Sequence, residues 1–298
     1  MIRYPFNRAN VEADIAALDP KWLEKAARRT NKFLELGRYE EKTTIWSAVK
    51  PVYMRLQHNK CVFCERKLET ETYGKIEHDL EHFRPKSSVL AWPDPNRHKD
   101  PAISYPTGAE APDGYYWLAY DLENYAAACK VCNTNFKLNY FPIAGFRARP
   151  PAAPEEKKAD LAIERSFLCY PLGELDADPQ SLVTFTATTA VPAAQDGHDR
   201  RRGEIIIEFF GLNKRENLHF ERAEIISAFC GGLLAARNNL INQTQEQIID
   251  EAKSSFFPHA GCLRAFLKLW LDDQPLAVQV YQSCFKYMWS QRAPIPRP

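Results

Sequence analysis

Two Cys-x-x-Cys pairs are the feature of this sequence that most constrains its fold. The first pair is Cys61 and Cys64, and the second is Cys129 and Cys132. Four thiolates at this paired spacing can close a tetrahedral zinc site, and a site filled by sulfur leaves no open position for chemistry. A redox role for one pair and chance are the alternatives. We therefore expect a structural Zn²⁺ that joins two remote stretches of chain.

The length of chain between the pairs indicates that a folded unit lies inside the zinc loop. Residues 65–128 separate the pairs, whereas a compact zinc ribbon has only about 15–20 residues at this point. Residues 75–83 are predicted to form a strand, and the aromatic stretch 115–120 is its predicted partner. A short helix is expected to begin within residues 132–139. The middle of the chain therefore predicts two strands and a helix held together by zinc.

The flanking segments have a different, helical character. We expect an N-terminal helical segment at 1–57, the zinc-stabilised core at 58–146 and a mainly helical C-terminal region at 147–298. The predicted fold class is α+β, with a zinc-stabilised ββα core embedded between mostly α-helical N- and C-terminal segments.

Composition indicates the cellular compartment of the protein but says little about its function. The 39 Lys and Arg residues nearly balance the 38 Asp and Glu residues, so net charge gives no sign of a nucleic-acid partner, although a local basic patch remains compatible with it. The sequence predicts no signal peptide, no membrane span and therefore a cytoplasmic location. In a reducing compartment cysteines act as ligands or core residues. Burial is the expectation for Cys169, Cys230, Cys262 and Cys284.

The dipeptide Glu81-His82 and the residue Asn133 supply the groups that phosphodiester hydrolysis requires. That reaction needs an activated water and a cation that neutralises the developing charge. His82 is the candidate general base, since its unperturbed pKa lies near working pH. Glu81 and Asn133 offer oxygens that suit Mg²⁺ or Mn²⁺. Neighbours on a strand point to opposite faces, so Glu81 and His82 share a site only if the strand ends there, which Pro85 favours.

At this point the motifs resemble a known family. Glu81-His82, then Asn124, then Asn133 directly after the second cysteine pair, is similar to the HNH (ββα-metal) endonucleases in the variant whose last letter is Asn. More narrowly, the chain resembles the HNH nuclease proteins of Septu-type and retron-associated anti-phage defence systems, which work with an ABC/SMC-like ATPase. The stretches that carry this resemblance are 81–86, 115–124 and 135–137.

The resemblance implies a role for each matching residue. It makes His82 the general base, Glu81 and Asn133 the ligands of the catalytic Mg²⁺ or Mn²⁺, and Asn124 a brace that hydrogen-bonds the catalytic loop. The four cysteines match structural zinc ligands. Phosphate contacts, or alternatively a solvated basic surface, are the expectation for Arg84, Lys86 and Lys137. The implied function is an HNH endonuclease that cuts DNA as the effector of a bacterial anti-phage system, with the ATPase as protein partner and no membrane.

Three alternatives stay open at this stage. Glu77-His78 precedes Glu81-His82 by four residues, and even spacing puts both histidines on one strand face, so His78 could be the base or a further ligand. The chain could also be an inactive, zinc-stabilised nucleic-acid-binding or scaffold subunit. Finally, the apolar stretch 205–210 could dock the ATPase or be buried. Linear order does not separate DNA from RNA as the substrate.

Overall fold

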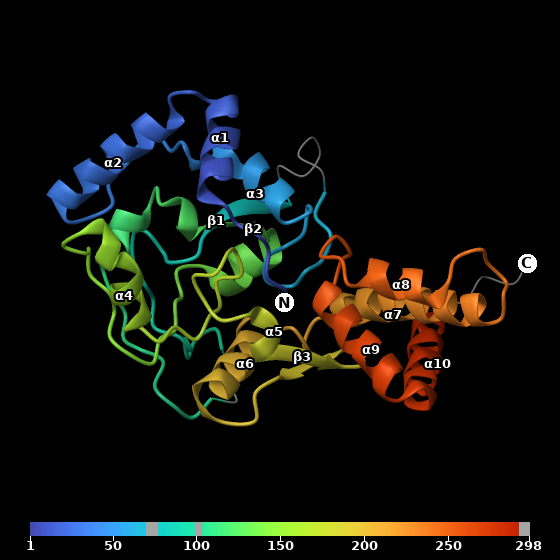
Figure 1. Cartoon of the computed structure of the whole chain (residues 1–298). Helices are drawn as coiled ribbons and strands as arrows, with labels where there is room; N and C mark the ends of the chain where they lie inside the picture. Colours follow the sequence, from blue (N-terminus) through green and yellow to red (C-terminus); the bar gives the residue numbers. More distant parts are fainter. Residues whose placement is uncertain (70–76, 99–102, 292–298) are drawn as a thin grey trace, which may run out of the picture.

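The computed structural model describes residues 1–69, 77–98 and 103–291 (Figure 1). It is a mixed helix and small-sheet fold, as predicted. Most of the chain surrounds a central two-stranded sheet. The helices α7 to α10 lie to one side of it in Figure 1.

The opening segment is helical, as predicted. It contains α1 (Arg8–Leu18), α2 (Trp22–Leu36) and α3 (Lys50–Leu56). The side chain of Asn7 accepts a hydrogen bond from the amide of Asn10, which satisfies a donor that the first turn of α1 leaves free. Gly37 ends α2 in the left-handed conformation, with φ of 65°.

The central sheet consists of β1 (His78–His82) and β2 (Tyr125–Cys129), which pair antiparallel. In this register His78 lies opposite Cys129, and His82 lies opposite Tyr125. A short helix with π-type hydrogen bonds, η4 (Val131–Lys137), follows β2 directly. The first cysteine pair precedes β1, whereas Cys129 is the last residue of β2 and Cys132 lies within η4. The part of the predicted first strand at 75–76 lies outside the described residues.

The predicted partner strand was placed too early in the chain. Residues 115–120 form a 3₁₀ turn, η2 (Tyr116–Leu118), instead of a strand. The ring of Tyr120 packs against α2, 6.1 Å from Trp22 and 6.2 Å from Phe33, while the ring of Tyr115 lies 5.7 Å from Phe141. The true partner, β2, is alanine-rich and buried at all five positions, a composition that strand propensity does not favour.

Small residues in β2 let other segments reach its backbone. The side-chain amide of Gln57 donates to the Ala127 carbonyl at 2.8 Å and accepts from the Ala127 amide at 2.8 Å. The amide of Val62 also donates to that carbonyl at 3.0 Å. The outer edge of a sheet exposes unpaired backbone groups, and these contacts satisfy them at Ala127. They also bring the first cysteine pair close to β2.

The C-terminal region begins with small elements that pack against the sheet-containing core. They are α4 (Lys157–Ala162), α5 (Pro179–Leu182), the hairpin of β3 (Val183–Thr186) and β4 (Thr189–Pro192), and α6 (Gly197–Phe209). In α6, Ile205, Ile206 and Phe209 are buried. The hypothesis that the stretch 205–210 is a free docking surface is therefore wrong, because its apolar side chains fill the core.

The last four helices have an apolar core of their own. They are α7 (Glu216–Arg237), α8 (Gln245–Ala252), α9 (Ala260–Asp272) and α10 (Gln274–Ser290). One cluster of buried side chains runs from Met1 to Leu218 with Ala260, and a second lies within α7 to α10. The buried Arg222 joins the hairpin to α7, donating to the carbonyls of Thr188 and Leu212 at 2.9 Å each. The boundaries at 57/58 and 146/147 stay predictions.

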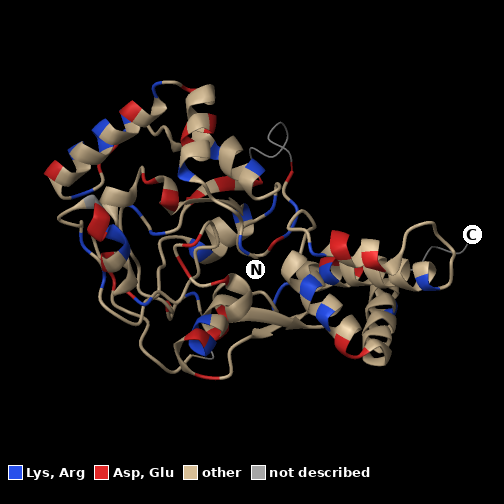
Figure 2. Ribbon diagram, in the orientation of Figure 1, with Lys and Arg blue, Asp and Glu red and all other residues tan. Residues whose placement is uncertain are grey.

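Two further features bear on possible partners. Within the described ranges, none of the helices combines the length and the apolar composition needed to cross a bilayer. Figure 2 shows basic and acidic residues interspersed along most elements. Attraction of a polyanion would therefore depend on a few local side chains.

Candidate active site and metal centre

The four paired cysteines meet in one buried cluster. The Sγ atoms of Cys61, Cys64, Cys129 and Cys132 all lie within 4.8 Å of one another, and none of these residues is in a disulfide. Cys64 Sγ lies 3.9 Å from Cys129 Sγ. Tetrahedral Zn–S bonds of about 2.3 Å place two sulfurs roughly 3.8 Å apart. The donor set and its spacing thus fit the predicted structural Zn²⁺.

The surroundings of the cluster suit a negatively charged metal centre. Four thiolates around Zn²⁺ carry a net charge of about −2. The guanidinium of Arg215 donates to Cys132 Sγ at 3.3 Å. The backbone amide of Cys132 points at Cys129 Sγ, 3.4 Å away. Donors of this kind orient thiolate ligands and disperse their charge.

A cavity of about 370 Å³ lies where β1 faces η4. Four of the predicted site residues line it together, namely Glu81, His82, Lys86 and Asn133. The assigned strand ends at His82, and the amide of Phe83 donates to the Asn124 carbonyl at 2.8 Å, one position further in the same register. Glu81 and His82 both line the cavity although they are neighbours on the strand. Further lining is supplied by Trp46, Lys50, Asp79, Pro85 and Asn139.

The imidazole of His82 is held in a defined orientation. Its Nε2 lies 3.0 Å from the Ala119 carbonyl oxygen, and because a carbonyl only accepts, Nε2 carries the proton and Nδ1 is left as the basic nitrogen. The rings of Trp46 and Tyr125 lie at 4.9 and 5.1 Å and fix the plane. Burial, followed by the charge of Lys86, lowers the pKa of His82 well below its usual value. A neutral imidazole is the form that a general base requires.

Glu81 is buried against an ammonium group. Its carboxylate lies 3.4 Å from Lys137 Nζ, and the Lys137 side chain is fully buried. Burial raises the pKa of Glu81 to about 7, although Lys137 opposes the rise. A carboxylate in such a site gains from a cation that compensates its charge.

Asn133 is positioned by a residue that the sequence analysis did not single out. Its Nδ2 donates to Asp79 Oδ2 at 2.9 Å, and Asp79 also pairs with Lys130 at 2.7 Å. Asp79 lies two residues before Glu81 on β1, which puts both carboxylates on one face. The even spacing of Asp79 and Glu81 is the sequence signal that could have identified Asp79 as a site residue.

Asn124 makes contacts of the kind that a brace requires. Its Oδ1 accepts from the Arg84 amide at 2.7 Å, and its Nδ2 donates to the carbonyls of Arg84 and Leu118 at 3.0 and 3.1 Å. The buried amide therefore clamps the chain directly after His82. It does not line the cavity at His82.

The three cations expected at a phosphate lie in different places. Lys86 lines the cavity, and its Nζ lies 4.5 Å from the centre of the Trp46 ring. Arg84 instead pairs with the buried carboxylate of Glu164 at 2.8 Å. Lys137 is buried beneath Glu81. The expectation of a phosphate contact is therefore corrected for Arg84 and Lys137, because buried acids hold both side chains away from the cavity surface.

The alternative histidine, His78, is turned away from this cavity. It is buried, and its Nε2 lies 3.2 Å from the Glu69 carbonyl oxygen. It is not among the residues that line the cavity at His82. Both histidines lie on β1. Because His82 lines the cavity and His78 does not, the geometry favours His82 as the base.

Comparison with known proteins gives one informative match. No protein-family model matches the chain, and no solved structure matches it. A Septu protein PtuB from Bacillus mycoides (strain KBAB4) is 29% identical over 178 residues, which are 60% of this chain and 50% of that protein. The chain thus spans about half the length of the curated relative that it matches. Membership of the HNH family stays a prediction. The similarity to Septu protein PtuB confirms the Septu part of the resemblance drawn from the sequence.

Proposed function

We propose that this protein is a subunit of an anti-phage defence system and that it hydrolyses DNA phosphodiester bonds as a metal-dependent HNH endonuclease. The similarity to Septu protein PtuB supports the defence role. The observation that carries the nuclease role is the cavity in which Glu81, His82 and Asn133 meet. An ABC/SMC-like ATPase partner belongs to the same proposal and is tested by co-purification across salt concentrations.

The cavity offers the oxygen donors that a hard cation prefers. Glu81 supplies a carboxylate and Asn133 an amide oxygen, with the Asp79 carboxylate beside it. Such donors suit Mg²⁺ or Mn²⁺ with several waters retained. When bound, the cation would neutralise the charge that develops on the phosphate and the leaving oxygen. The separate sulfur cluster fits Zn²⁺ in a structural role, with no open position.

The chain's own groups define the remaining steps. Nδ1 of His82 takes a proton from water, and the resulting hydroxide attacks phosphorus in line with the 3′ oxygen. The P–O3′ bond breaks and the leaving 3′ oxygen takes a proton from a second water, so the products are a 5′ phosphate and a 3′ hydroxyl end. Lys86 lies at the cavity wall, where its ammonium can attract a phosphate oxygen. Asn124 keeps His82 in place by clamping the residues that follow it.

Plasmid nicking with Mn²⁺ or Mg²⁺ tests this proposal directly. We expect the wild type to nick supercoiled DNA and His82→Ala to lose at least about 100-fold in rate, the range for loss of a general base. The matched control is His219→Ala, a histidine on α7 whose ring contacts Thr188 and Asn213 and not the cavity. Both variants should keep the wild-type far-UV circular dichroism spectrum. Equal nicking by wild type and His82→Ala would overturn the assigned base.

One observation favours the second candidate, an inactive zinc-stabilised nucleic-acid-binding or scaffold subunit. The ammonium of Lys137 already compensates Glu81, so a catalytic cation would compete with it. In that case the purified protein would hold zinc and bind DNA, yet the cavity would bind neither Mn²⁺ nor Mg²⁺. A Mn²⁺ titration followed by electron paramagnetic resonance separates the two candidates without reference to activity.

A further inference from the structure

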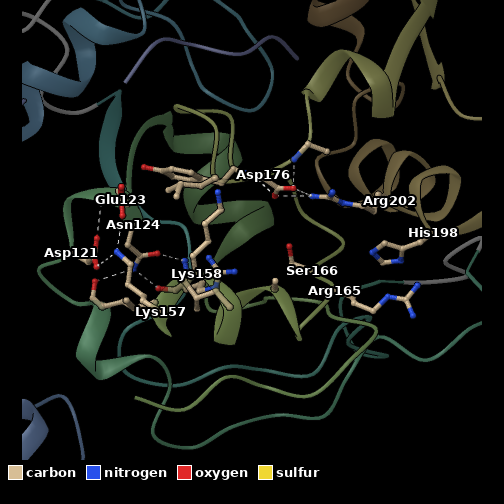
Figure 3. A pocket seen from close by; sticks show the side chains of 17 residues that line it. Asp121, Glu123, Asn124, Lys157, Lys158, Arg165, Ser166, Asp176, His198 and Arg202 are labelled. Carbon is tan, nitrogen blue, oxygen red and sulfur yellow. Dashed lines mark hydrogen bonds and ion pairs between the residues drawn. The ribbon is translucent and has the colours of Figure 1, made fainter. Parts of the chain in front are cut away.

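A second cavity lies behind the loop that follows His82 (Figure 3). Its volume is about 400 Å³, and it shares no lining residue with the cavity at Glu81 and His82. It is bounded by residues of η3 (Leu122–Asn124), α4 and α6 and by the loops between them. The proposed nuclease chemistry makes no use of this space.

One part of the second cavity is apolar. Leu118, Leu161, Tyr170 and Leu175 contribute to its walls. Pockets for small organic ligands combine such walls with a few placed polar groups, and they have volumes of about 300–1,000 Å³. The apolar part therefore suits a flat, largely apolar group such as a nucleobase.

The charges of the cavity are separated along its length. Figure 3 shows Arg165, His198 and Arg202 at one end and the carboxylates Asp121 and Glu123 at the other. The two carboxylates at the acidic end are balanced by two cations: Lys157 Nζ lies 2.8 Å from Asp121 and 2.7 Å from Glu123, and Arg8 Nη2 lies 3.2 Å from Glu123. At the other end the Asp176 carboxylate pairs with Arg202 at 2.7 Å, so the excess positive charge there is that of Arg165.

Two buried nitrogens at the basic end lack partners. Arg202 is only 6% exposed, and its Nη2 is bonded to Asp176 and the Leu168 carbonyl. Its Nε, and Nδ1 of His198, have no hydrogen-bond partner among the described residues. A buried polar atom without a partner is expensive in free energy. Both nitrogens are covered by protein atoms, so the exposed guanidinium of Arg165 is the donor that a ligand meets first at this end.

Two exposed cations add positive charge along the cavity, Arg165 at the basic end and Lys158 nearer to Lys157 (Figure 3). Lys158 and Arg165 line the cavity, and in the described part of the chain neither has an acidic ion-pair partner. Arg202 and Arg165 also lower the pKa of His198, after the larger effect of burial. The local potential is therefore positive, which favours an anionic group.

We propose that this second cavity binds a mononucleotide, with the phosphate at Arg165, His198 and Arg202 and the base against the Leu118 and Tyr170 wall. The side chain of Asn124 lies in the same wall and clamps the backbone of Arg84. Occupancy is thereby transmitted to the loop after His82. This coupling, unlike the binding, rests on the proposed nuclease function.

Isothermal titration calorimetry of the full chain with AMP, GMP and ATP, and with adenosine and inorganic phosphate, tests the binding. We expect at least one nucleotide to bind about tenfold or more tightly than adenosine or phosphate alone, since both halves of the ligand contribute. Lys158→Glu and Arg165→Asn should each weaken it about tenfold, the loss expected for a charge-assisted contact. Asn suits position 165 because φ there is 45°. Lys42→Glu, an exposed lysine outside the cavity, is the matched control.

Several results would overturn the binding proposal. They are absence of nucleotide binding at millimolar concentration, equal binding of inorganic phosphate, and affinity that Lys158→Glu and Arg165→Asn leave unchanged. Loss of binding in Lys86→Met would place the nucleotide in the other cavity and would also overturn it. His82→Ala should bind as the wild type does.

Nicking assays separate the coupling from the proposed nuclease function. We expect the bound nucleotide to change the wild-type nicking rate, and Lys158→Glu to need about tenfold more nucleotide for the same change. An unchanged wild-type rate at saturating nucleotide overturns the coupling alone. A wild type that never nicks overturns the nuclease function, while the calorimetry still decides the binding.

Discussion

Asp79 on β1 accepts a hydrogen bond from Nδ2 of Asn133 on η4, at 2.9 Å. A carboxylate only accepts, so this contact engages the amide nitrogen of Asn133 and leaves Oδ1 as the atom available to a cation. Lys130 pairs with the same carboxylate at 2.7 Å and holds it in place. Asp79 is therefore a positioning residue for the proposed catalytic cation.

Replacement of Asp79 by Ala tests this positioning role. We expect Mn²⁺ affinity to fall about 10–100-fold, the usual loss when a group that orients a metal ligand is removed. Nicking should recover at saturating Mn²⁺, because the proposed general base, His82, is untouched. Metal titration by electron paramagnetic resonance and nicking across Mn²⁺ concentrations measure both effects. Asp14→Ala, an exposed acid on α1, is the control, and unchanged Mn²⁺ affinity in Asp79→Ala would contradict the role.

Replacement of Cys132 by Ser tests the zinc centre. We expect zinc content to fall from about one ion per chain, and the free energy of unfolding to drop by more than about 4 kcal/mol, as for loss of a structural metal. Cys230→Ser is the matched control, since that thiol is also buried but lies in the core of α7 to α10. Elemental analysis and urea denaturation give the two numbers. Equal zinc content in both variants would refute the assignment.

Two basic side chains near the loop after β1 should respond differently to substitution. Lys86→Met is expected to weaken DNA binding and to reduce the slope of log K against log salt by about 1, because one phosphate contact is lost. Arg84→Met should leave that slope unchanged. It should instead lower the free energy of unfolding by about 3–5 kcal/mol, because the fully buried Glu164 loses its ion-pair partner. Fluorescence anisotropy at several salt concentrations and urea denaturation distinguish the two; the reverse pattern would contradict their placement.

Substitutions in the pair of Glu81 and Lys137 distinguish its contribution to stability from its role in metal binding. Glu81→Gln is expected to lower the free energy of unfolding by about 3–5 kcal/mol, since it leaves the buried Lys137 ammonium without its counter-charge. The double variant with Lys137→Met should regain most of that stability. Mn²⁺ binding should stay lost in both, because the carboxylate ligand is absent from both. Recovery of Mn²⁺ binding in the double variant would remove Glu81 from the proposed ligand set.

Local spacing in the sequence was sufficient for the features that depend on neighbouring residues. The two-residue gap within each cysteine pair allowed both thiols to face one ion, and the four sulfurs do meet. Glu81 and His82 are adjacent in the sequence at the end of β1, and both line one cavity. Strand propensity misplaced the second strand, since aromatic residues at 115–120 pack against helices and the buried strand is built from alanine.

The sequence by itself determined which groups are present and which of them lie close along the chain: the four thiols, the adjacent acid and imidazole, and Asn133 after the second pair. Only the tertiary structure decided which partner each charged side chain contacts. Arg84 is paired with Glu164, 80 residues away, and Asp79 with Asn133, 54 residues away. The physical reason is that a charge shielded from water takes a partner, charged or hydrogen-bonding, that compensates its lost hydration. Chain packing selects that partner, and spacing along the sequence does not.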